Sequence, residues 1–387
     1  AADAAGRRAA GPAPAALMHD FRPGLPDLGL FPRGAWARAT RAALASMPDT
    51  ELGYTDPAGL PRLRAALAGY LGRVRGVACT PDQVVVCNGF GHGFGLVVRA
   101  LADRGPLDVA VEVPGHADPR DQVVRAGGRV HGVPVDGEGL RTAELAALPV
   151  AAVVVTPAHQ YPTGAVLSPR RRTELAAWAQ ATGATIVEDD YDAEYRYDRH
   201  PVGALQGVAP DRVVYSGTLS KSLAPGLRLG WLVVPPDLLD AVLQVRLDTD
   251  QMTASFTQAA FTEFLERGDL DRHLRRTRRV YRQRRDALVE AVARELPGAR
   301  VSSVSAGLHV LVGLPAGWDS AEVVDAAREA GVGVHTITDP LTDPELVAST
   351  LVLGYGMLRP AQIDEGIRRL AAALGGRRHR HHGHRRR

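Results

Sequence analysis

Lysine is almost absent from this chain of 387 residues. Among its 46 lysine and arginine side chains Lys221 is the only lysine. Arginine holds phosphates and forms salt bridges, but it does not lose its proton and attack a carbonyl as a primary amine. A composition that replaces lysine wherever arginine will serve therefore marks Lys221 as a candidate amine nucleophile. Chance survival of one loop lysine is the alternative that composition leaves open.

Cysteine and long apolar runs are scarce as well. Cys79 and Cys87 are the only cysteines, which excludes a disulfide framework and favours a reducing cytoplasm. No apolar run approaches the ~18 residues that a membrane span needs, and the Ala/Gly/Pro-rich start lacks the apolar core of a secretion signal. The net charge is only +3, and 45% of the residues are hydrophobic. We expect a cytoplasmic protein with one large and one small domain, without a membrane partner.

The residues around Lys221 fit a phosphorylated carbonyl compound. The stretch 216–230, SGTLSKSLAPGLRLG, places the hydroxyls of Thr218 and Ser220 beside the lysine, and Arg228 follows closely. Hydroxyls hydrogen-bond phosphate oxygens, and a guanidinium forms a fork with them. A nucleophilic amine beside a phosphate site suits a phosphorylated aldehyde cofactor, namely pyridoxal phosphate (PLP).

The stretch 184–197, ATIVEDDYDAEYRY, is the second informative one. An apolar strand ends here in acidic residues, and open α/β sheets bind ligands at the carboxyl ends of their strands. PLP chemistry needs one carboxylate against the pyridine nitrogen, because a protonated ring withdraws electrons from the substrate. A solvated acidic loop is the alternative, and the lysine stretch that follows about thirty residues later argues against it.

Together these stretches resemble the fold-type I PLP enzymes, and most closely the aminotransferase-like domain of the MocR branch of GntR-type regulators. YTDPAG (54–59) and TPAHQYPTG (156–164) match the same family, and the resemblance covers about residues 20–374. It implies an α/β fold with a mostly parallel, seven-stranded sheet in a large domain and a small C-terminal α/β domain. The winged helix-turn-helix of MocR regulators is missing here, so the chain is expected to be a stand-alone enzyme or to lack an upstream part.

The expected organisation follows from composition and from this resemblance. Its parts are a flexible leader (1–16), an N-terminal segment that packs with the small domain (17–50), the large PLP-binding domain (51–270), the small domain (271–374) and a basic, disordered tail (375–387).

The resemblance also implies roles for single residues. Lys221 would hold PLP as a Schiff base and move the substrate proton, Asp189 would face the pyridine nitrogen, and Tyr191 would bond the 3-hydroxyl group. The other residues expected against the phosphate or the ring are Phe90, Gly91, His92, Thr218, Ser220, Arg228 and Tyr161. Tyr54 would reach the phosphate of a neighbouring subunit, which implies a homodimer with shared active sites. A tyrosine packed beside a turn is the alternative for Tyr54.

The chain departs from the family pattern at His116, where most MocR-like domains have tyrosine against the cofactor ring. A stacked imidazole polarises the ring and also moves protons. Histidine at this place is seen in PLP enzymes that decarboxylate, eliminate or condense, so we include His116 among the candidate catalytic residues. A structural histidine is the alternative.

The substrate-binding residues are less well marked. His159 and Gln160 are candidates for contacts with the ring and the substrate. Amino-acid-processing relatives have an arginine in G-[FY]-A-R, which binds the substrate carboxylate as a fork. The matching position here is Met357, and Arg359 is the expected substitute if the loop is displaced.

Three functions fit these observations. The first is an aminotransferase acting on an amino acid or amine. The second is a PLP enzyme that performs elimination, replacement or carbon–carbon bond formation in a biosynthetic pathway. The third is a transcriptional regulator that senses PLP, against which the missing winged helix argues.

Two basic segments are expected to be exposed to solvent rather than to bind a ligand. The arginine-dense helix expected over 272–292 is read as a solvated face, with nucleic-acid binding as the minor alternative. The histidines of the tail are read as part of a solvated segment, and we expect no metal.

Overall fold

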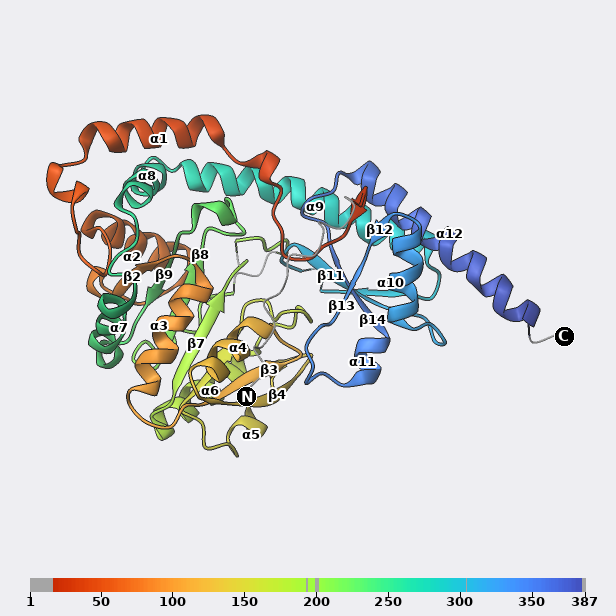
Figure 1. Ribbon diagram of the computed structural model, residues 1–387, viewed down its shortest axis with the longest axis horizontal. Helices are drawn as coiled ribbons and strands as arrows, with labels where there is room; N and C mark the ends of the chain where they lie inside the picture. The colour runs from red at the N-terminus through yellow and green to blue at the C-terminus, as the bar shows by residue number, and fades with distance from the viewer. Residues whose placement is uncertain (1–16, 193, 199–201, 304, 385–387) are drawn as a thin grey trace, which may run out of the picture.

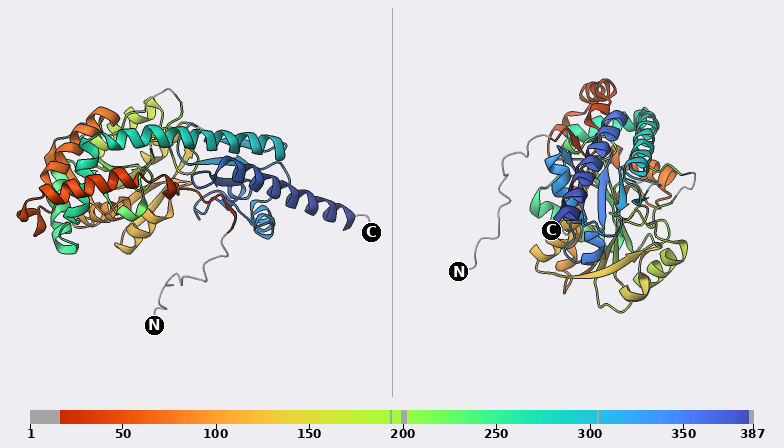
Figure 2. Two further views of the ribbon diagram at one scale, coloured as in Figure 1. Left: turned by 90° about the horizontal axis from the view of Figure 1, so that it is seen from above. Right: turned by 90° about the vertical axis from the view of Figure 1, so that its right-hand side faces the viewer.

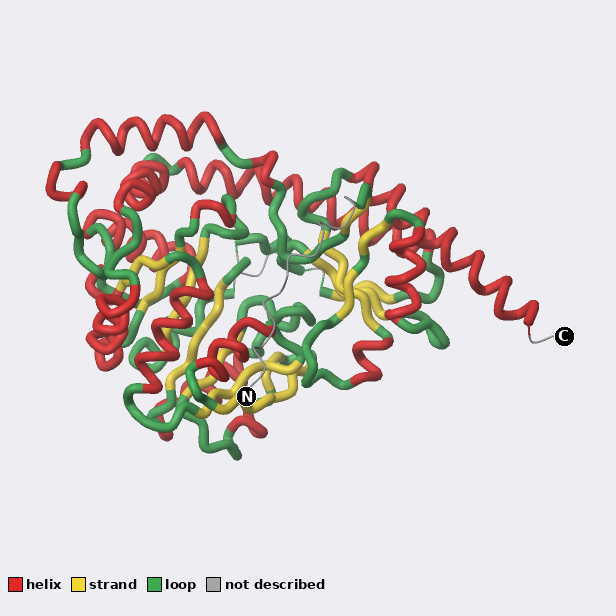
Figure 3. The backbone as a smooth tube through the Cα atoms, viewed as in Figure 1, coloured by secondary structure: helices red, strands yellow, loops and turns green. Residues whose placement is uncertain are grey.

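A computed structural model describes residues 17–192, 194–198, 202–303 and 305–384. Figure 1 shows two α/β bodies of unequal size, and Figure 3 shows the strands gathered into these two groups. The leader predicted over 1–16 lies outside the described residues, as do residues 385–387 at the end of the predicted tail.

The larger body is built on an eight-stranded sheet in the order β2-β9-β8-β7-β6-β3-β4-β5. Its strands are β2 (Val84–Cys87), β3 (Asp108–Val113), β4 (Arg129–Asp136), β5 (Gly139–Leu140), β6 (Ala152–Val155), β7 (Thr185–Asp190), β8 (Val213–Thr218) and β9 (Gly230–Val233). Neighbours from β8 to β4 pair in parallel, whereas β9 and β5 pair antiparallel. The mostly parallel sheet is as predicted. The strand count of seven is corrected to eight, because the short β5 folds back on β4 at one edge.

Helices cover both faces of this sheet. They are α1 (Arg33–Ser46), α2 (Pro61–Arg75), α3 (Phe90–Ala102), α4 (Ala117–Arg125), α5 (Thr142–Leu145), α6 (Pro169–Thr182), α7 (Pro236–Thr249) and α8 (Ser255–Glu266), with 3-10 turns η1 (Leu28–Leu30), η2 (Asp49–Leu52), η3 (Pro81–Gln83) and η4 (Pro225–Leu227). Residues of α3 and α7 pack on one face and residues of α6 on the other. Strands such as β2 and β6 are buried along their whole length, as their unbroken apolar sequences predict.

The smaller body has a four-stranded sheet in the order β10-β11-β14-β13. Its elements are β10 (Arg300–Ser302), β11 (His309–Gly313), α10 (Ser320–Glu329), β12 (Val332–Gly333), β13 (His335–Thr336), α11 (Pro344–Ala348), β14 (Thr350–Gly354) and α12 (Pro360–His384).

The N-terminal segment is divided between the two bodies. Strand β1 (His19–Asp20) pairs in parallel with β12, so the start of the segment lies with the smaller body. Helix α1, however, lies along α8, where the Trp36 ring lies 5.6 Å from the Phe264 ring and Ala39 and Ala43 are buried. The prediction that all of 17–50 packs with the small domain is therefore wrong for α1, whose alanine stripe fits the surface of α8.

Helix α9 (Asp269–Glu295) spans both bodies, and Figure 2 shows it running lengthwise across the molecule. Several of its arginines donate hydrogen bonds to main-chain carbonyls of loops that pass it: Arg276 to Leu30, Arg278 to Glu194, Arg282 to Tyr197 and Arg284 to Gly356. The prediction of a merely solvated arginine face is thus corrected. These side chains tie loops to the helix that joins the two bodies.

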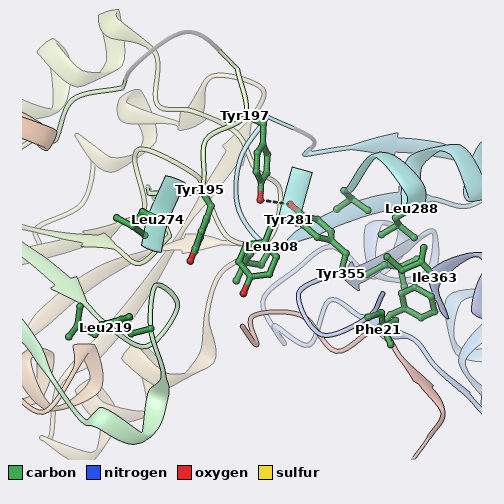
Figure 4. Packing of buried hydrophobic residues seen from close by; sticks show 14 of the residues in the cluster. Phe21, Tyr195, Tyr197, Leu219, Leu274, Tyr281, Leu288, Leu308, Tyr355 and Ile363 are labelled. Carbon is green, nitrogen blue, oxygen red and sulfur yellow. Dashed lines mark hydrogen bonds between the residues drawn. The ribbon is translucent and has the colours of Figure 1, made fainter. Parts of the chain in front are cut away.

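Aromatic side chains fill the space where α9 passes between the bodies. Figure 4 shows Tyr195, Tyr197, Tyr281 and Tyr355 gathered there. The rings of Tyr195 and Tyr281 meet edge to face at 5.0 Å, and the Tyr355 hydroxyl lies 3.4 Å from that of Tyr197.

The end of the chain differs from the prediction of a disordered tail. Helix α12 continues to His384 and extends beyond the smaller body (Figure 1). Arginine is a good helix former, so the arginine-rich end continues the helix. Within the described part of the chain, none of the helices combines the length and hydropathy required to cross a membrane.

Candidate active site

A cavity of about 370 Å³ lies between the two bodies at the carboxyl ends of the central strands. Its walls come from the larger sheet, from β11 of the smaller body and from the N-terminal segment at Pro23, Gly24 and Leu25. The predicted site residues that line it are Lys221, Asp189, Tyr191, His116, Phe90, Gly91, Thr218, Ser220, Arg228 and Tyr161. The fold therefore gathers most of the predicted site into one space.

Lys221 follows β8 and enters the cavity as an amine in a largely buried place. Its Nζ donates a hydrogen bond of 2.6 Å to the carbonyl oxygen of Gly24. Burial lowers the pKa of this lysine, and the negative charges of Asp192 and Asp189 oppose that shift. A lowered pKa leaves more of the amine unprotonated and able to attack a carbonyl.

Asp189 lies at the end of β7, in register with Ser216 of β8. Its Oδ1 is buried and has no hydrogen-bond partner among the described residues. Burial, reinforced by the neighbouring Asp190, raises the pKa of Asp189 well above its usual value. Asp190 is instead satisfied, because Arg75 lies 2.7 Å from its Oδ2 and the Tyr215 hydroxyl donates to the same oxygen at 2.6 Å. Of these two neighbouring aspartates, Asp189 is therefore the one whose carboxyl group remains available to a ligand.

The other end of the cavity is suited to an anion. It is formed by the N-terminus of α3, where main-chain N–H groups lack helical partners, and by the Arg228 guanidinium, whose Nη2 donates to the Asn88 carbonyl at 2.5 Å. Gly89 precedes the helix with φ +93°, and a Cβ there would lie 3.6 Å from Arg228. The Ser220 and Thr218 hydroxyls are 3.0 Å apart nearby.

His92 does not line this cavity, although it lies in the first turn of α3. Its Nδ1 accepts a hydrogen bond from the Asn88 N–H at 3.0 Å, and its Nε2 lies 3.4 Å from Asp250. Burial lowers the pKa of His92. The side chain therefore supports the turn before α3, and only its main-chain N–H remains a candidate for the anion site.

His116 and Tyr161 stand on one wall of the cavity. Their ring centroids are 5.5 Å apart, and the His116 Nδ1 caps α4 by accepting from the Asp118 N–H at 3.3 Å. Burial lowers the pKa of His116 and raises that of Tyr161. A neutral imidazole and a neutral phenol on this wall offer a ring face rather than a charge.

His159 and Gln160, which the sequence suggested as substrate contacts, lie behind the wall instead. His159 Nδ1 is 2.9 Å from the Asp192 carboxylate and its Nε2 is 3.1 Å from the Ser303 hydroxyl. The Gln160 amide donates to the carbonyl of Pro114 at 2.8 Å. Both are buried and hold the loops that carry Tyr191 and Tyr161, so their predicted contact with substrate is not what the geometry provides.

Tyr54 and Arg359 also lie outside the cavity. The Tyr54 side chain is 89% exposed on the turn after η2, and Arg359 is exposed at the start of α12. The displaced loop that would bring Arg359 to a substrate does not occur, since Tyr355 is anchored to the Gly307 carbonyl through its hydroxyl at 2.6 Å.

The structure adds site residues that sequence reasoning missed. Glu112 of β3 lines the cavity, and its Oε2 accepts from the Thr156 N–H at 3.1 Å and from the Thr156 hydroxyl at 2.5 Å. Burial raises the pKa of Glu112 to about 7. The sequence signal that could have identified Glu112 is a single acidic residue within the apolar strand VAVEV. His309 of β11 also lines the cavity, and burial lowers its pKa to about 4.

No set of three or more His, Cys, Asp and Glu side chains in the described part of the chain is arranged to hold a metal ion.

Comparison with known proteins places the chain among aminotransferase-like proteins. The family model for aminotransferase class I and II matches residues 27–370. The probable rhizopine catabolism regulatory protein MocR of Rhizobium meliloti is 33% identical over 358 residues, which are 92% of this chain and 72% of that protein.

Two solved structures agree with the fold. The multiple substrate aminotransferase of Thermococcus profundus has a TM-score of 0.84 at 26% identity, covering 95% of this chain and 93% of the other. LysN, the alpha-aminoadipate aminotransferase of Thermus thermophilus, has a TM-score of 0.79 at 28% identity, covering 92% of each chain. The LysN structure contains N-(5'-phosphopyridoxyl)-L-leucine.

Proposed function

Because the chain belongs to the family of class I and II aminotransferases, we propose that it is an enzyme that transfers the amino group of an amino acid or amine. Its cofactor is pyridoxal phosphate, and its fold is that of the fold-type I PLP enzymes, so both expectations from the sequence are confirmed. The roles of individual residues, described next, are part of the proposal.

The residues of the cavity fit this cofactor at three points. The buried Asp189 Oδ1 has no hydrogen-bond partner among the described residues and would gain one in a protonated ring nitrogen. The N-terminus of α3 and Arg228 would hold the phosphate. The Lys221 amine enters the same cavity and would carry the aldehyde carbon. When bound, the cofactor supplies an electron-withdrawing ring that accepts electrons from the carbon bearing the amino group.

Lys221 is the proposed acid–base group. Its pKa is lowered by burial, so the amine released by an incoming substrate can take the proton from the substrate carbon and later return one. The hydrogen bond to Gly24 fixes the side chain when it is not reacting. The observation that carries this function is that the only lysine of the sequence faces the same cavity as a buried carboxyl whose Oδ1 has no partner in the described part of the chain.

Asp189 and His116 would act on the ring from two directions. A carboxylate at Asp189 would keep the ring nitrogen protonated, and the positive charge of the ring would in turn lower the pKa of Asp189, which burial alone raises. The neutral imidazole of His116 would lie against the ring face.

We propose that two copies of the chain share their active sites. Tyr54 supports this, because it is 89% exposed and cannot line the cavity of its own chain as placed. A second cavity of about 500 Å³, lined by Gly91, His92 and Gln122, opens beside the anion end. Its position suits a tyrosine supplied by another copy. The free cysteines are consistent with a reducing cytoplasm, where we place the protein.

Borohydride reduction tests the proposed function. Treatment of the PLP-loaded protein should leave a pyridoxyl adduct on Lys221 that peptide mapping detects. The Lys221→Arg variant keeps the charge but has no nucleophilic amine, and it should give no adduct. A wild-type protein that gives no adduct after PLP is supplied would refute the proposal.

A second candidate is a PLP-sensing transcriptional regulator, which the 33% identity to MocR favours. Sequence-specific DNA binding by this chain in a gel-shift assay, without turnover of any amine, would support the regulator and oppose the enzyme. A third candidate is elimination, replacement or carbon–carbon bond formation, which His116 favours. Release or coupling of a side-chain fragment, rather than amino-group exchange, would identify it.

A further inference from the structure

The cavity beside Lys221 has more acidic than basic side chains, although burial raises the pKa of Glu112 to about 7 and that of Asp189 well above its usual value. Its acidic side chains are Glu112, Asp118, Asp189 and Asp192, and its lysine and arginine side chains are Lys221 and Arg228. Asp118 is open to solvent, whereas Asp192 is buried and lies close enough to Lys221 to influence its pKa.

Both cations are engaged when the cofactor is in place. The proposed function assigns Arg228 to the phosphate and Lys221 to the aldehyde carbon. The two histidines on the walls do not replace them, because burial lowers the pKa of His116 and lowers that of His309 to about 4. At neutral pH His309 is therefore uncharged, and its Nε2 is engaged with the Pro162 carbonyl at 3.1 Å.

Arginines close to the walls are also engaged elsewhere. Arg120, which follows the wall residue Pro119, is buried in an ion pair with Asp339. Arg284 is buried and pairs with Asp27 at 2.6 Å. Among the described residues of this chain, a carboxylate on the substrate would therefore meet no uncommitted cation in the cavity, and it would lie near Asp192. A buried charge without a partner is strongly unfavourable.

We infer that the donor is a primary amine that carries no carboxylate on the carbon bearing the amino group. This inference rests on the proposed function and names its substrate class. The donor arrives as an ammonium ion, which Asp192 and Asp118 attract. In the reaction the donor carbon is oxidised to a carbonyl whose oxygen comes from water. The nitrogen and the electron pair pass to the cofactor aldehyde carbon, which is reduced to an aminomethyl group.

Pairs of donors that differ only in the α-carboxylate test this inference. The PLP-loaded protein is mixed with putrescine or ornithine, cadaverine or lysine, and phenethylamine or phenylalanine. The readouts are the loss of long-wavelength absorbance and the appearance of the aminomethyl cofactor by mass spectrometry. We expect the amine of a pair to react at least about tenfold faster than its amino acid. Equal rates, or faster amino acids, would overturn the inference while leaving the proposed function in place.

If neither class of donor reacts, the proposed function fails, and the inference fails with it; the borohydride adduct then shows only that the cofactor binds. A variant adds a direct test of the charge argument. Leu25→Arg places a cation on the cavity wall beside Gly24, and Leu25→Gln is the uncharged comparison. The ratio of the amine rate to the amino-acid rate should be at least about threefold lower in the arginine variant than in the glutamine variant. An unchanged preference in a folded arginine variant would contradict the charge argument.

Discussion

The amine of Lys221 donates a hydrogen bond to the carbonyl of Gly24 across 2.6 Å, although the two residues are 197 positions apart in the chain. Gly24 adopts φ +75°, and a Cβ on it would lie 3.5 Å from the lysine nitrogen. The N-terminal segment thus contacts the one nucleophilic amine directly, and this contact joins the segment to the proposed chemistry.

Replacing Gly24 with alanine should slow the reaction of Lys221. The positive φ is unfavourable for alanine, at a cost of about 1 kcal/mol, and the added methyl group would touch the amine. Gly183→Ala is the matched control, because Gly183 has the same φ of +75° with nothing within 4 Å. We expect both variants to lose similar unfolding free energy in urea, and only Gly24→Ala to form the borohydride adduct more slowly. Equal adduct rates would show that the contact has no chemical role.

The two neighbouring aspartates of β7 should lose very different amounts of stability when each is replaced by asparagine. Asp190→Asn breaks the buried pair with Arg75 and should cost about 3–5 kcal/mol. Asp189→Asn replaces a carboxyl whose charged form is already disfavoured by burial, so stability should change much less, by about 0.5 kcal/mol. Urea unfolding and absorbance of the PLP-loaded protein measure the two effects. Asp189→Asn should form the adduct but lose turnover, and normal turnover would exclude Asp189 from the ring nitrogen.

Glu112→Gln should change how stability depends on pH. Burial raises the pKa of Glu112 from 4.5 to about 7. Between these values the folded protein binds the proton more tightly than the unfolded chain, so stability falls as pH rises through this window. Glutamine has no carboxyl group to ionise, so the variant does not lose this stability as the pH rises. The variant should match wild type near pH 5 and be more stable near about pH 8, by on the order of 2 kcal/mol. Parallel pH profiles in urea unfolding would contradict the buried position of this carboxyl.

The arginines of α9 should differ in their importance for stability. Arg284 is buried, pairs with Asp27 at 2.6 Å and donates to the Gly356 carbonyl, so Arg284→Ala leaves a buried pair broken and should cost about 3 kcal/mol. Arg279 is exposed on the same helix, and Arg279→Ala should stay within about 0.5 kcal/mol of wild type. Thermal unfolding of the two variants compares them. Similar losses in both would mean that the helix does not depend on its carbonyl contacts.

The sequence alone identified the parts of the site that are local. Asp189 lies at the end of a buried strand and Lys221 follows the end of the next one, and a parallel sheet brings strand ends of this kind together at one edge. Helix α6 likewise begins at Pro169 and ends before Gly183, because the residues that start and stop a helix lie within a few positions of its ends.

Other expectations were wrong because residues that are distant in the sequence determine where these side chains lie. His159 and Gln160 share a motif with Tyr161, but only Tyr161 lines the cavity, since the other two bond to Asp192 and to Pro114 behind the wall. Glu112 was missed because its partner Thr156 directly follows the adjacent strand β6, which is distant in the sequence.

The sequence by itself determined the family, the cofactor and the lysine that would bind it, because these depend on side-chain chemistry at fixed spacing. Only the tertiary structure decided what surrounds that lysine: a carbonyl from the N-terminal segment, a histidine from β11 and an excess of carboxyl groups. The balance of charge in a cavity is a sum over elements that are far apart in the chain, and only folding brings those elements to one place.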